Sequence, residues 1–330
     1  MKNGQYRRYG IEKVTVSIVI VCMNNLKNLY PCLDSIQEYT TIDYETLVVA
    51  YLFPQENLQK LKIDYPWVTV IESNEIRGFS ENNNLALRQA QGKYCFVVND
   101  DTEMTMPVVD ELVKTIESLP EKVAIVSPVT TFPDGRVQVC GRPPMSWKTM
   151  ILSKFHLWSE KKGPYANKKG VFKSYNIIGA AFLIKKEIFK QIGWFDEYYF
   201  FCPEDIALST KLNETGYECW VNANSAIIHY EGMSGASTSF IKCATAPASR
   251  IGNLRFFSNN SNLGYWALCL SMASITVVSM LYHFIKSCVK TKPNPDYIFF
   301  LSEWNSIKAS LLKKKPKDAF SYYFRKYNNE

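Results

Sequence analysis

Short apolar runs alternate with amphipathic stretches along the first third of the chain. Four of these runs have the length and the β-branched content of buried parallel strands: Val16–Val21, Thr46–Ala50, Val68–Ile71 and Tyr94–Val98. Helical spacing predicts helices in the segments near Leu26–Glu38, Gln55–Lys62 and Glu81–Gln91, and again over Val108–Ser118, where Pro107 suits a first turn. This alternation predicts a doubly wound α/β domain, whose sheet binds ligands at the carboxyl ends of its strands.

The pattern changes after residue 123, where apolar runs become shorter and connections longer. The segment 142–170 has little periodicity and is predicted to be a mobile loop over a site, or else a surface excursion. Pro203 begins a predicted helix that reaches about Glu214.

Two acidic clusters carry the candidate chemistry. The strand Tyr94–Val98 runs directly into Asn99-Asp100-Asp101-Thr102-Glu103, which places carboxylates at a sheet edge. A divalent cation that carries a diphosphate is a natural counter-charge there. The second cluster, Glu204-Asp205, is followed by His229 after a further apolar strand. Each feature alone also has a plainer interpretation, since such residues form turns, complement a helix dipole or sit in a core.

Composition fits a folded intracellular enzyme. The 330 residues are 47% apolar, enough for one large core and an appendage. The nine cysteines are scattered, odd in number and never in a C-x-x-C pair, which predicts a reducing cytosol rather than a disulfide framework. The first apolar run is short and reads as a strand, so no signal peptide is expected.

The last ninety residues differ from the rest. The segment 256–285 has no charged side chain, and 263–285 is long and apolar enough to cross a bilayer as a helix. The last 45 residues hold ten basic and four acidic side chains, a net +6 out of +7 for the whole chain. A span would place this tail outside, against the positive-inside tendency. We therefore expect a helix in the inner leaflet with its basic tail on anionic headgroups, the alternative being a buried helix. No nucleic-acid module is recognisable.

Over residues 14–235 the chain resembles the inverting family 2 glycosyltransferases, which have the glycosyltransferase A fold, and within them bacterial rhamnosyltransferase-like enzymes of cell-surface polysaccharide assembly. The matching stretches occur in the family's order: 16–25, 77–84, 99–102, 179–184, 193–197, 204–205 and 227–232. The resemblance implies a catalytic domain over 1–240, with a nucleotide-binding half at about 14–105 and an acceptor-side half at about 106–240. A helical region over 241–330 would follow, with the apolar helix 263–285 and the basic tail.

The resemblance also implies roles for the matching residues. Asp205 would be the catalytic base, and Asp101 with His229 would hold Mn²⁺ or Mg²⁺. The donor, a nucleotide-diphosphate sugar, would contact Asn24, Asn83, Asn84, Asn99 and Asp100. The acceptor, a glycan or lipid-linked glycan, would contact Trp194, Phe195 and Glu204. The expected location is the inner face of the plasma membrane, peripheral or monotopic, with possible homo-oligomers through the C-terminal helices.

The sequence departs from the family after the second strand. Tyr51-Leu52-Phe53 stands there, where the family has an acidic residue that helps to hold the nucleobase, so an aromatic ring or Asn24 would have to hold the base instead.

Other classes of enzyme lack the motifs that they need. A nucleotidyltransferase would need a basic Gly-rich loop after Val16–Val21, a phosphatase would need Asp in place of Asn99, and a nicotinamide enzyme would need G-x-G-x-x-G. The alternative that stays open is a non-catalytic sugar-nucleotide-binding or membrane scaffold protein.

Overall fold

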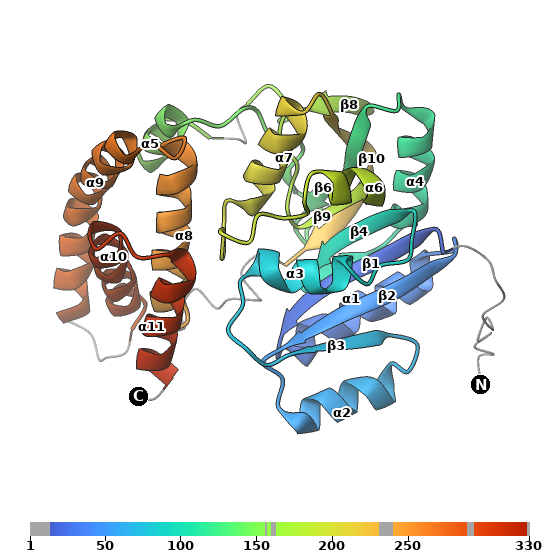
Figure 1. The fold of residues 1–330 in the computed structure, drawn as a ribbon, viewed down its shortest axis with the longest axis horizontal. Coiled ribbons are helices and arrows are strands. Elements are labelled where there is room, and N and C mark those ends of the chain that lie inside the picture. Colours follow the sequence, from blue (N-terminus) through green and yellow to red (C-terminus); the bar gives the residue numbers. More distant parts are fainter. Residues whose placement is uncertain (1–13, 156, 160–162, 231–239, 289–293, 329–330) are drawn as a thin grey trace.

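A ten-stranded mixed sheet forms the centre of the larger part of the molecule (Figure 1). The computed structural model describes residues 14–155, 157–159, 163–230, 240–288 and 294–328. The strand order is β3-β2-β1-β4-β9-β6-β10-β5, with β7 beside β6 and β8 beside β10. The strands are β1 Val16–Met23, β2 Tyr44–Tyr51, β3 Thr69–Ser73, β4 Tyr94–Asn99, β5 Thr102–Met104, β6 Val123–Thr131, β7 Val137–Val139, β8 Val171–Ser174, β9 Ala181–Lys185 and β10 Glu218–His229.

The predicted α/β architecture is confirmed. The first four strands are parallel, as their apolar runs indicated, and β9 then joins β4 in antiparallel orientation, so the sheet is mixed. The helices of this part are α1 Leu26–Tyr39, α2 Gln55–Asp64, α3 Phe79–Leu87, α4 Val108–Ser118, α6 Lys186–Gln191 and α7 Glu204–Glu214.

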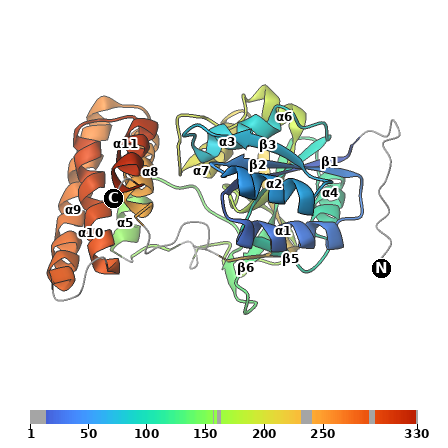
Figure 2. The same ribbon diagram turned by 90° about the horizontal axis from the view of Figure 1, so that it is seen from below.

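Helices cover both faces of the sheet. Alternate side chains of a strand point to opposite sides, so each strand contributes to the core on both faces. Ile18 and Ile20 of β1 pack in one core with side chains of α1, α2 and α4. Val19, between them, packs in a second core with side chains of α3, α6 and α7. Figure 2 shows α1 and α3 on opposite sides of the strands. This burial on both faces is the reason that the parallel strands are almost wholly apolar.

A separate group of helices, α8 Lys242–Phe257, α9 Asn262–Cys288, α10 Pro295–Leu311 and α11 Pro316–Asn328, follows the sheet (Figures 1 and 2). Helix α5 (Trp147–Lys154) lies beside this group, where Met150 and Ile151 pack against side chains of α8 and α9. The segment 142–170 therefore includes a helix that the sequence did not predict. None of the residues of α5 is buried, so its sequence has no apolar stripe at helical spacing that could have predicted it.

Helix α9 matches the predicted apolar helix and extends it at both ends. Within the described residues it is the one helix long and apolar enough to cross a membrane, and 28% of its most apolar window is buried in the protein. Its buried side chains include Leu268, Met272 and Thr276, which form a stripe against the neighbouring helices. The opposite face is apolar and exposed; its largest side chains there are Leu263, Trp266, Leu270, Val277, Val278, Leu281, Tyr282, Phe284 and Ile285.

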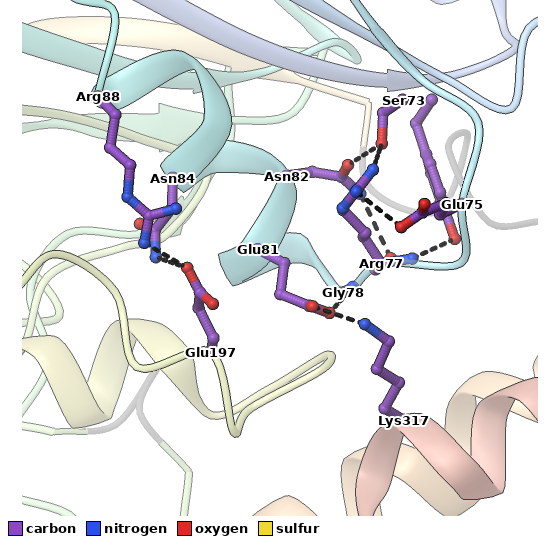
Figure 3. Close-up of polar contacts among 11 residues, drawn as sticks. Ser73, Glu75, Arg77, Gly78, Glu81, Asn82, Asn84, Arg88, Glu197 and Lys317 are labelled. Carbon is purple, nitrogen blue, oxygen red and sulfur yellow. Dashed lines mark hydrogen bonds and ion pairs between the residues drawn. The ribbon is translucent and has the colours of Figure 1, made fainter.

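The C-terminal helices are attached to the sheet domain at α3 and at the loop before α7. Figure 3 shows Lys317 of α11 reaching Glu81 of α3, with 2.7 Å between Nζ and Oε1. The rings of Phe200 and Phe320 lie 4.3 Å apart. A Cβ atom on Gly252 of α8 would come within 2.6 Å of the Cys202 carbonyl oxygen. The helices therefore pack directly against the loop that leads into α7.

Candidate active site

Strand pairing brings His229 to the acidic turn after β4. Residues 102–104 form β5, which pairs antiparallel with the end of β10 so that His229 lies opposite Thr102. His229 Nε2 is consequently 3.4 Å from Oδ1 of Asp101, the residue before that strand. The Asp101 side chain is almost completely buried, and that of His229 is 16% exposed. A carboxylate and an imidazole thus converge at the sheet edge where the sequence predicted them.

Gln138 fixes the protonation pattern of the His229 ring. Its side-chain Nε2 donates to the His229 backbone carbonyl at 2.6 Å, which leaves Oε1, 3.1 Å from His229 Nδ1, as an acceptor. This contact calls for a proton on Nδ1, and a ring that carried only that proton would have Nε2 free to bind a metal. Nε2 faces Asp101, the arrangement of a metal-binding histidine oriented by a hydrogen bond on its other nitrogen.

Asn99 and Asp100 complete the turn. The side-chain oxygen of Asn99 is buried and has no hydrogen-bond partner among the described residues, which is unusual for a buried polar atom. Asp100 is 4% exposed, and burial raises the pKa of its carboxyl to about 7. Both groups lie within two residues of Asp101, and a ligand bound there could satisfy the Asn99 oxygen.

Asp205 lies in the first turn of α7 and forms an ion pair with Arg142. The two side chains are each 16% exposed, and Arg142 donates to Asp205 Oδ2 at 2.6 Å. The other carboxylate oxygen accepts from the Ile206 backbone N–H at 2.8 Å. These contacts hold the Asp205 carboxylate in one orientation at the helix N-terminus.

The small residues Gly179 and Ala180 lie between the two acidic groups. The Ala180 carbonyl accepts from the Asn99 backbone N–H at 2.9 Å, which ties this segment to the end of β4. A Cβ atom on Gly179 would lie 3.2 Å from the Asp205 carboxylate. One short segment therefore touches the turn that holds Asp101 on one side and Asp205 on the other, so the two features belong to a single site.

Glu204 differs from its neighbour Asp205 in being enclosed. It is 8% exposed, and its Oε2 atom is buried without a hydrogen-bond partner among the described residues. Burial, together with the charge of Asp205, raises the pKa of Glu204 well above its usual range. The contact of Glu204 with the acceptor stays a prediction. Its raised pKa means that the Glu204 carboxyl keeps its proton near neutral pH.

Three of the predicted contact residues are almost completely buried. Asn83 and Asn84 are at most 1% exposed; the Asn83 amide donates to the Phe79 carbonyl, and Asn84 bonds to the backbone of Phe195. The side-chain oxygen of Asn83 is buried and has no hydrogen-bond partner among the described residues. Phe195 is 2% exposed, with its ring 5.2 Å from that of Phe189. The roles of these three residues as substrate contacts stay predictions.

The remaining predicted contacts stay at or near the surface. Trp194 is half-buried with its ring 5.3 Å from that of Phe189, and Asn24 is exposed after β1, where it accepts from Asn57 at 2.8 Å. Tyr51 and Phe53 are 5% and 7% exposed, so neither ring is free to stack on a base. Asn24 is the candidate that is left for the nucleobase. Glu231 and Gly232, the end of the last matching stretch, lie outside the described residues.

The donor set fits a divalent cation that shares its ligands with a diphosphate. Asp101 and His229 would hold the metal, and the buried Asn99 oxygen adds a further oxygen donor nearby. The part of the chain that the structure describes contains no group of three or more His, Cys, Asp or Glu that could hold a metal by itself. Mg²⁺ and Mn²⁺ sites of this kind take their remaining ligands from substrate phosphates and water.

Two site residues were missed by sequence reasoning. Gln138 lies in β7, 91 residues from His229, and Arg142 lies in the connection that follows β7, 63 residues from Asp205. Neither belongs to a recognisable motif, and the only available signal was their position near the start of an aperiodic segment.

Comparisons of the sequence with known proteins identify the family. The glycosyl transferase family 2 model matches residues 17–193. The O-antigen biosynthesis protein RfbC of Myxococcus xanthus is 27% identical over 195 residues, which are 58% of this chain but only 14% of the relative. The chain thus spans about a seventh of that curated relative.

Solved structures share the fold at low sequence identity. GalNAc-T7 with UDP, GalNAc and Mn²⁺ has a TM-score of 0.53 at 19% identity, covering 71% of this chain and 47% of that one. The mannosyltransferase PcManGT of Pyrobaculum calidifontis, in complex with GDP-Man and Mn²⁺, has a TM-score of 0.53 at 14% identity, covering 92% and 87%. S. aureus TarS 1-349 has a TM-score of 0.51 at 14% identity, covering 96% and 92%.

The mixed sheet has the arrangement of the glycosyltransferase A fold, which the solved structures share. The chain belongs to glycosyl transferase family 2, whose model matches more than half of it.

Proposed function

We propose that this protein transfers a sugar from a nucleotide-diphosphate donor to a hydroxyl of a glycan acceptor, with inversion at the anomeric carbon. The observation that carries the proposal is the single site in which Gly179 and Ala180 join the Asp101–His229 pair to Asp205. The GDP-Man and Mn²⁺ bound by PcManGT, and the UDP, GalNAc and Mn²⁺ bound by GalNAc-T7, support this donor class.

The proposed reaction is one displacement. The acceptor oxygen forms a bond to the anomeric carbon while the bond from that carbon to the donor diphosphate breaks, and the hydroxyl proton passes to Asp205. Arg142 orients the accepting carboxylate by its ion pair. A divalent metal, Mn²⁺ or Mg²⁺, would supply charge neutralisation for the departing diphosphate. Asp101 and His229 would hold that metal.

The polysaccharide setting is supported by the relative in O-antigen biosynthesis. We infer that the acceptor is a glycan of the cell surface, carried on a lipid, and that the protein works at the cytoplasmic face of the membrane. The exposed apolar face of α9 supports a membrane contact.

The packing around α9 favours a helix that lies in the membrane surface over one that crosses it. Thr276, near the middle of α9, accepts from Arg250 of α8, which forms a close ion pair with Glu303 of α10. A bilayer centred on α9 would bring this pair to its hydrocarbon core, where charged groups are costly. We therefore propose that the buried stripe of α9 faces the protein and its apolar face meets the lipid.

Thermal unfolding with a panel of nucleoside diphosphates and sugar nucleotides tests the proposal. A donor at a hundred times its dissociation constant should add about 2.7 kcal/mol of stability. We expect a shift that requires Mn²⁺ or Mg²⁺ and disappears in D101A. D205N should keep the shift but lose sugar transfer. A folded wild-type protein that no nucleotide stabilises, with or without metal, would favour the non-catalytic scaffold.

A further inference from the structure

A pocket at the edge of the C-terminal helices lies outside the site described above. Its volume is about 290 Å³, and it is bordered by the turn between α8 and α9 and by the connection between α10 and α11. Four basic side chains line it: Arg255, Lys313, Lys314 and Lys315. We call it the basic pocket.

The basic pocket gathers positive charge that, among the described residues, has aromatic rings but no carboxylate as partners. No acidic residue lines it, and among the described residues none of its four basic side chains forms an ion pair with a carboxylate. Lys313 Nζ instead donates to the side-chain oxygen of Asn262, a neutral group, at 2.6 Å. Like charges held together repel one another, so an anion that enters the pocket would relieve this repulsion. Hydroxyl and amide groups that also line it can donate hydrogen bonds to such an anion.

Exposed apolar side chains adjoin the basic pocket in the sequence. Leu263 follows the lining residue Asn262 and is 82% exposed, and Leu312 precedes Lys313 and is 59% exposed. Trp266, next to the lining residue Tyr265, is 37% exposed and begins the apolar face of α9. Cations beside exposed leucine and tryptophan form the pattern by which proteins rest on an anionic bilayer. The anion is therefore best supplied by a lipid.

The basic pocket also touches the segment that leads to the proposed base. Tyr198, which lies between α6 and α7, lines the pocket, and its ring is 5.4 Å from the Arg255 guanidinium. Four residues later, the Cys202 carbonyl lies against Gly252, one turn before Arg255 on α8. A group bound in the pocket therefore lies beside the loop that leads into α7.

We propose that the basic pocket binds the phosphate group of a membrane lipid. The inference rests on the membrane placement in the proposed function, and it assigns to the pocket the recognition of one headgroup in addition to the apolar contact of α9. Arg255 and the three lysines bind the phosphate oxygens, and Leu263 and Leu312 enter the acyl region beside it.

Vesicle sedimentation tests the proposal with the full-length protein. Wild-type protein should bind phosphatidylcholine vesicles that contain phosphatidic acid more tightly than vesicles of phosphatidylcholine alone. The variant K313Q/K314Q/K315Q should lose at least roughly tenfold in affinity for the phosphate-bearing vesicles. The matched variant K60Q/K190Q/K211Q, which removes the same charge from exposed positions on α2, α6 and α7, should lose less than about twofold.

A second pair of variants separates a defined pocket from diffuse attraction. S261E puts a carboxylate in the pocket, and S118E puts one at an exposed position on α4. Only S261E should weaken vesicle binding substantially. Equal losses in the two members of either matched pair, or no loss in the pocket variants, would overturn the proposal. Tight binding of inorganic pyrophosphate without binding to phosphate-bearing vesicles would also overturn it, because the ligand would then be soluble.

The nucleotide test keeps this inference distinct from the proposed function. In folded K313Q/K314Q/K315Q, the metal-dependent thermal shift with the donor should equal that of wild type, because the pocket is not part of the donor site. If K313Q/K314Q/K315Q kept that shift and also bound vesicles as tightly as wild type, the pocket alone would be refuted. If wild-type protein showed no shift with any donor but bound the phosphate-bearing vesicles, the donor site alone would be refuted.

Discussion

Glu204 and Asp205 are neighbours in sequence but have opposite surroundings. Asp205 has a guanidinium partner and a backbone donor, whereas the carboxyl of Glu204 is enclosed and has an oxygen without a partner among the described residues. Burial raises the pKa of Glu204 from 4.5 to about 8. The folded protein therefore holds a proton on Glu204 that the unfolded chain releases above about pH 4.5.

This difference makes stability depend on pH. Between about pH 4.5 and 8 the folded state binds more protons, so its free energy of unfolding falls as pH rises, by at most ~1.4 kcal/mol per pH unit. E204Q cannot ionise and should lose this dependence. We expect the stability of E204Q relative to wild type to increase from pH 5.5 to 7.5 in urea unfolding. E187Q, at an exposed position on α6, is the control; an equal, pH-independent offset for both variants would contradict the assignment.

At the residue scale, sequence reasoning found the groups that follow an element boundary. Asp101 follows a strand end, where the apolar pattern places it at the sheet edge, and Asp205 lies at a helix start, where only the family resemblance suggested a role for it. It did not predict the bond from Asn84 to the Phe195 backbone, because a polar residue on a helix can equally bond to a distant segment of the chain. It also failed for Arg142, since an ion pair across 63 residues leaves no local trace.

At the scale of elements, periodicity predicted the regular structure well. The helix predicted at Val108–Ser118 has those bounds, and each predicted strand lies within two residues of an observed one. Strand order could not be predicted, because the antiparallel insertion of β9 between β4 and β6 depends on contacts between distant segments. The same holds for β5, a strand of three residues that positions His229 through pairing alone.

Close packing between α8 and the loop before α7 gives a prediction at this scale. Because a Cβ atom on Gly252 would lie 2.6 Å from the Cys202 carbonyl oxygen, G252A should force the helix and the loop apart. We expect a loss of about 1–3 kcal/mol in the free energy of unfolding, measured with denaturant, and reduced transfer activity. G264A is the control, since its nearest contact would be 3.3 Å, to the side chain of Ser258. Similar stabilities for the two variants would show that the contact does not constrain α8.

At the scale of the molecule, the exposed face of α9 is the largest feature that the sheet domain does not explain. The helix is roughly 40 Å long and carries large apolar side chains along its outer face. A folded protein that keeps such a face in water would tend to associate through it. The sequence predicted the apolar helix, but which of its sides is buried became visible only from its packing against α8 and α10.

Replacing part of this face should release the protein from membranes. L270S/V278S/L281S removes three side chains that are 57%, 73% and 51% exposed, so the fold should survive. At about 1 kcal/mol each, their loss should weaken vesicle binding roughly a hundredfold. I63S/V137S/V171S, at exposed sites on α2, β7 and β8 of the sheet domain, should bind like wild type. If the α9 variant instead bound vesicles normally but changed from oligomer to monomer in sedimentation velocity, the face would be a protein interface.

The contact of Phe200 with Phe320 has a geometric consequence for an enzyme that rests on a membrane. These contacts couple the loop before α7 to the C-terminal helices, so on the membrane proposed above the protein itself would set the height of Asp205 over the lipid. An acceptor anchored in the same membrane offers its hydroxyl groups at heights that depend on how many sugars it already carries. An enzyme that holds Asp205 at one height would select acceptors by length, and would act on glycans of one length in preference to shorter or longer ones.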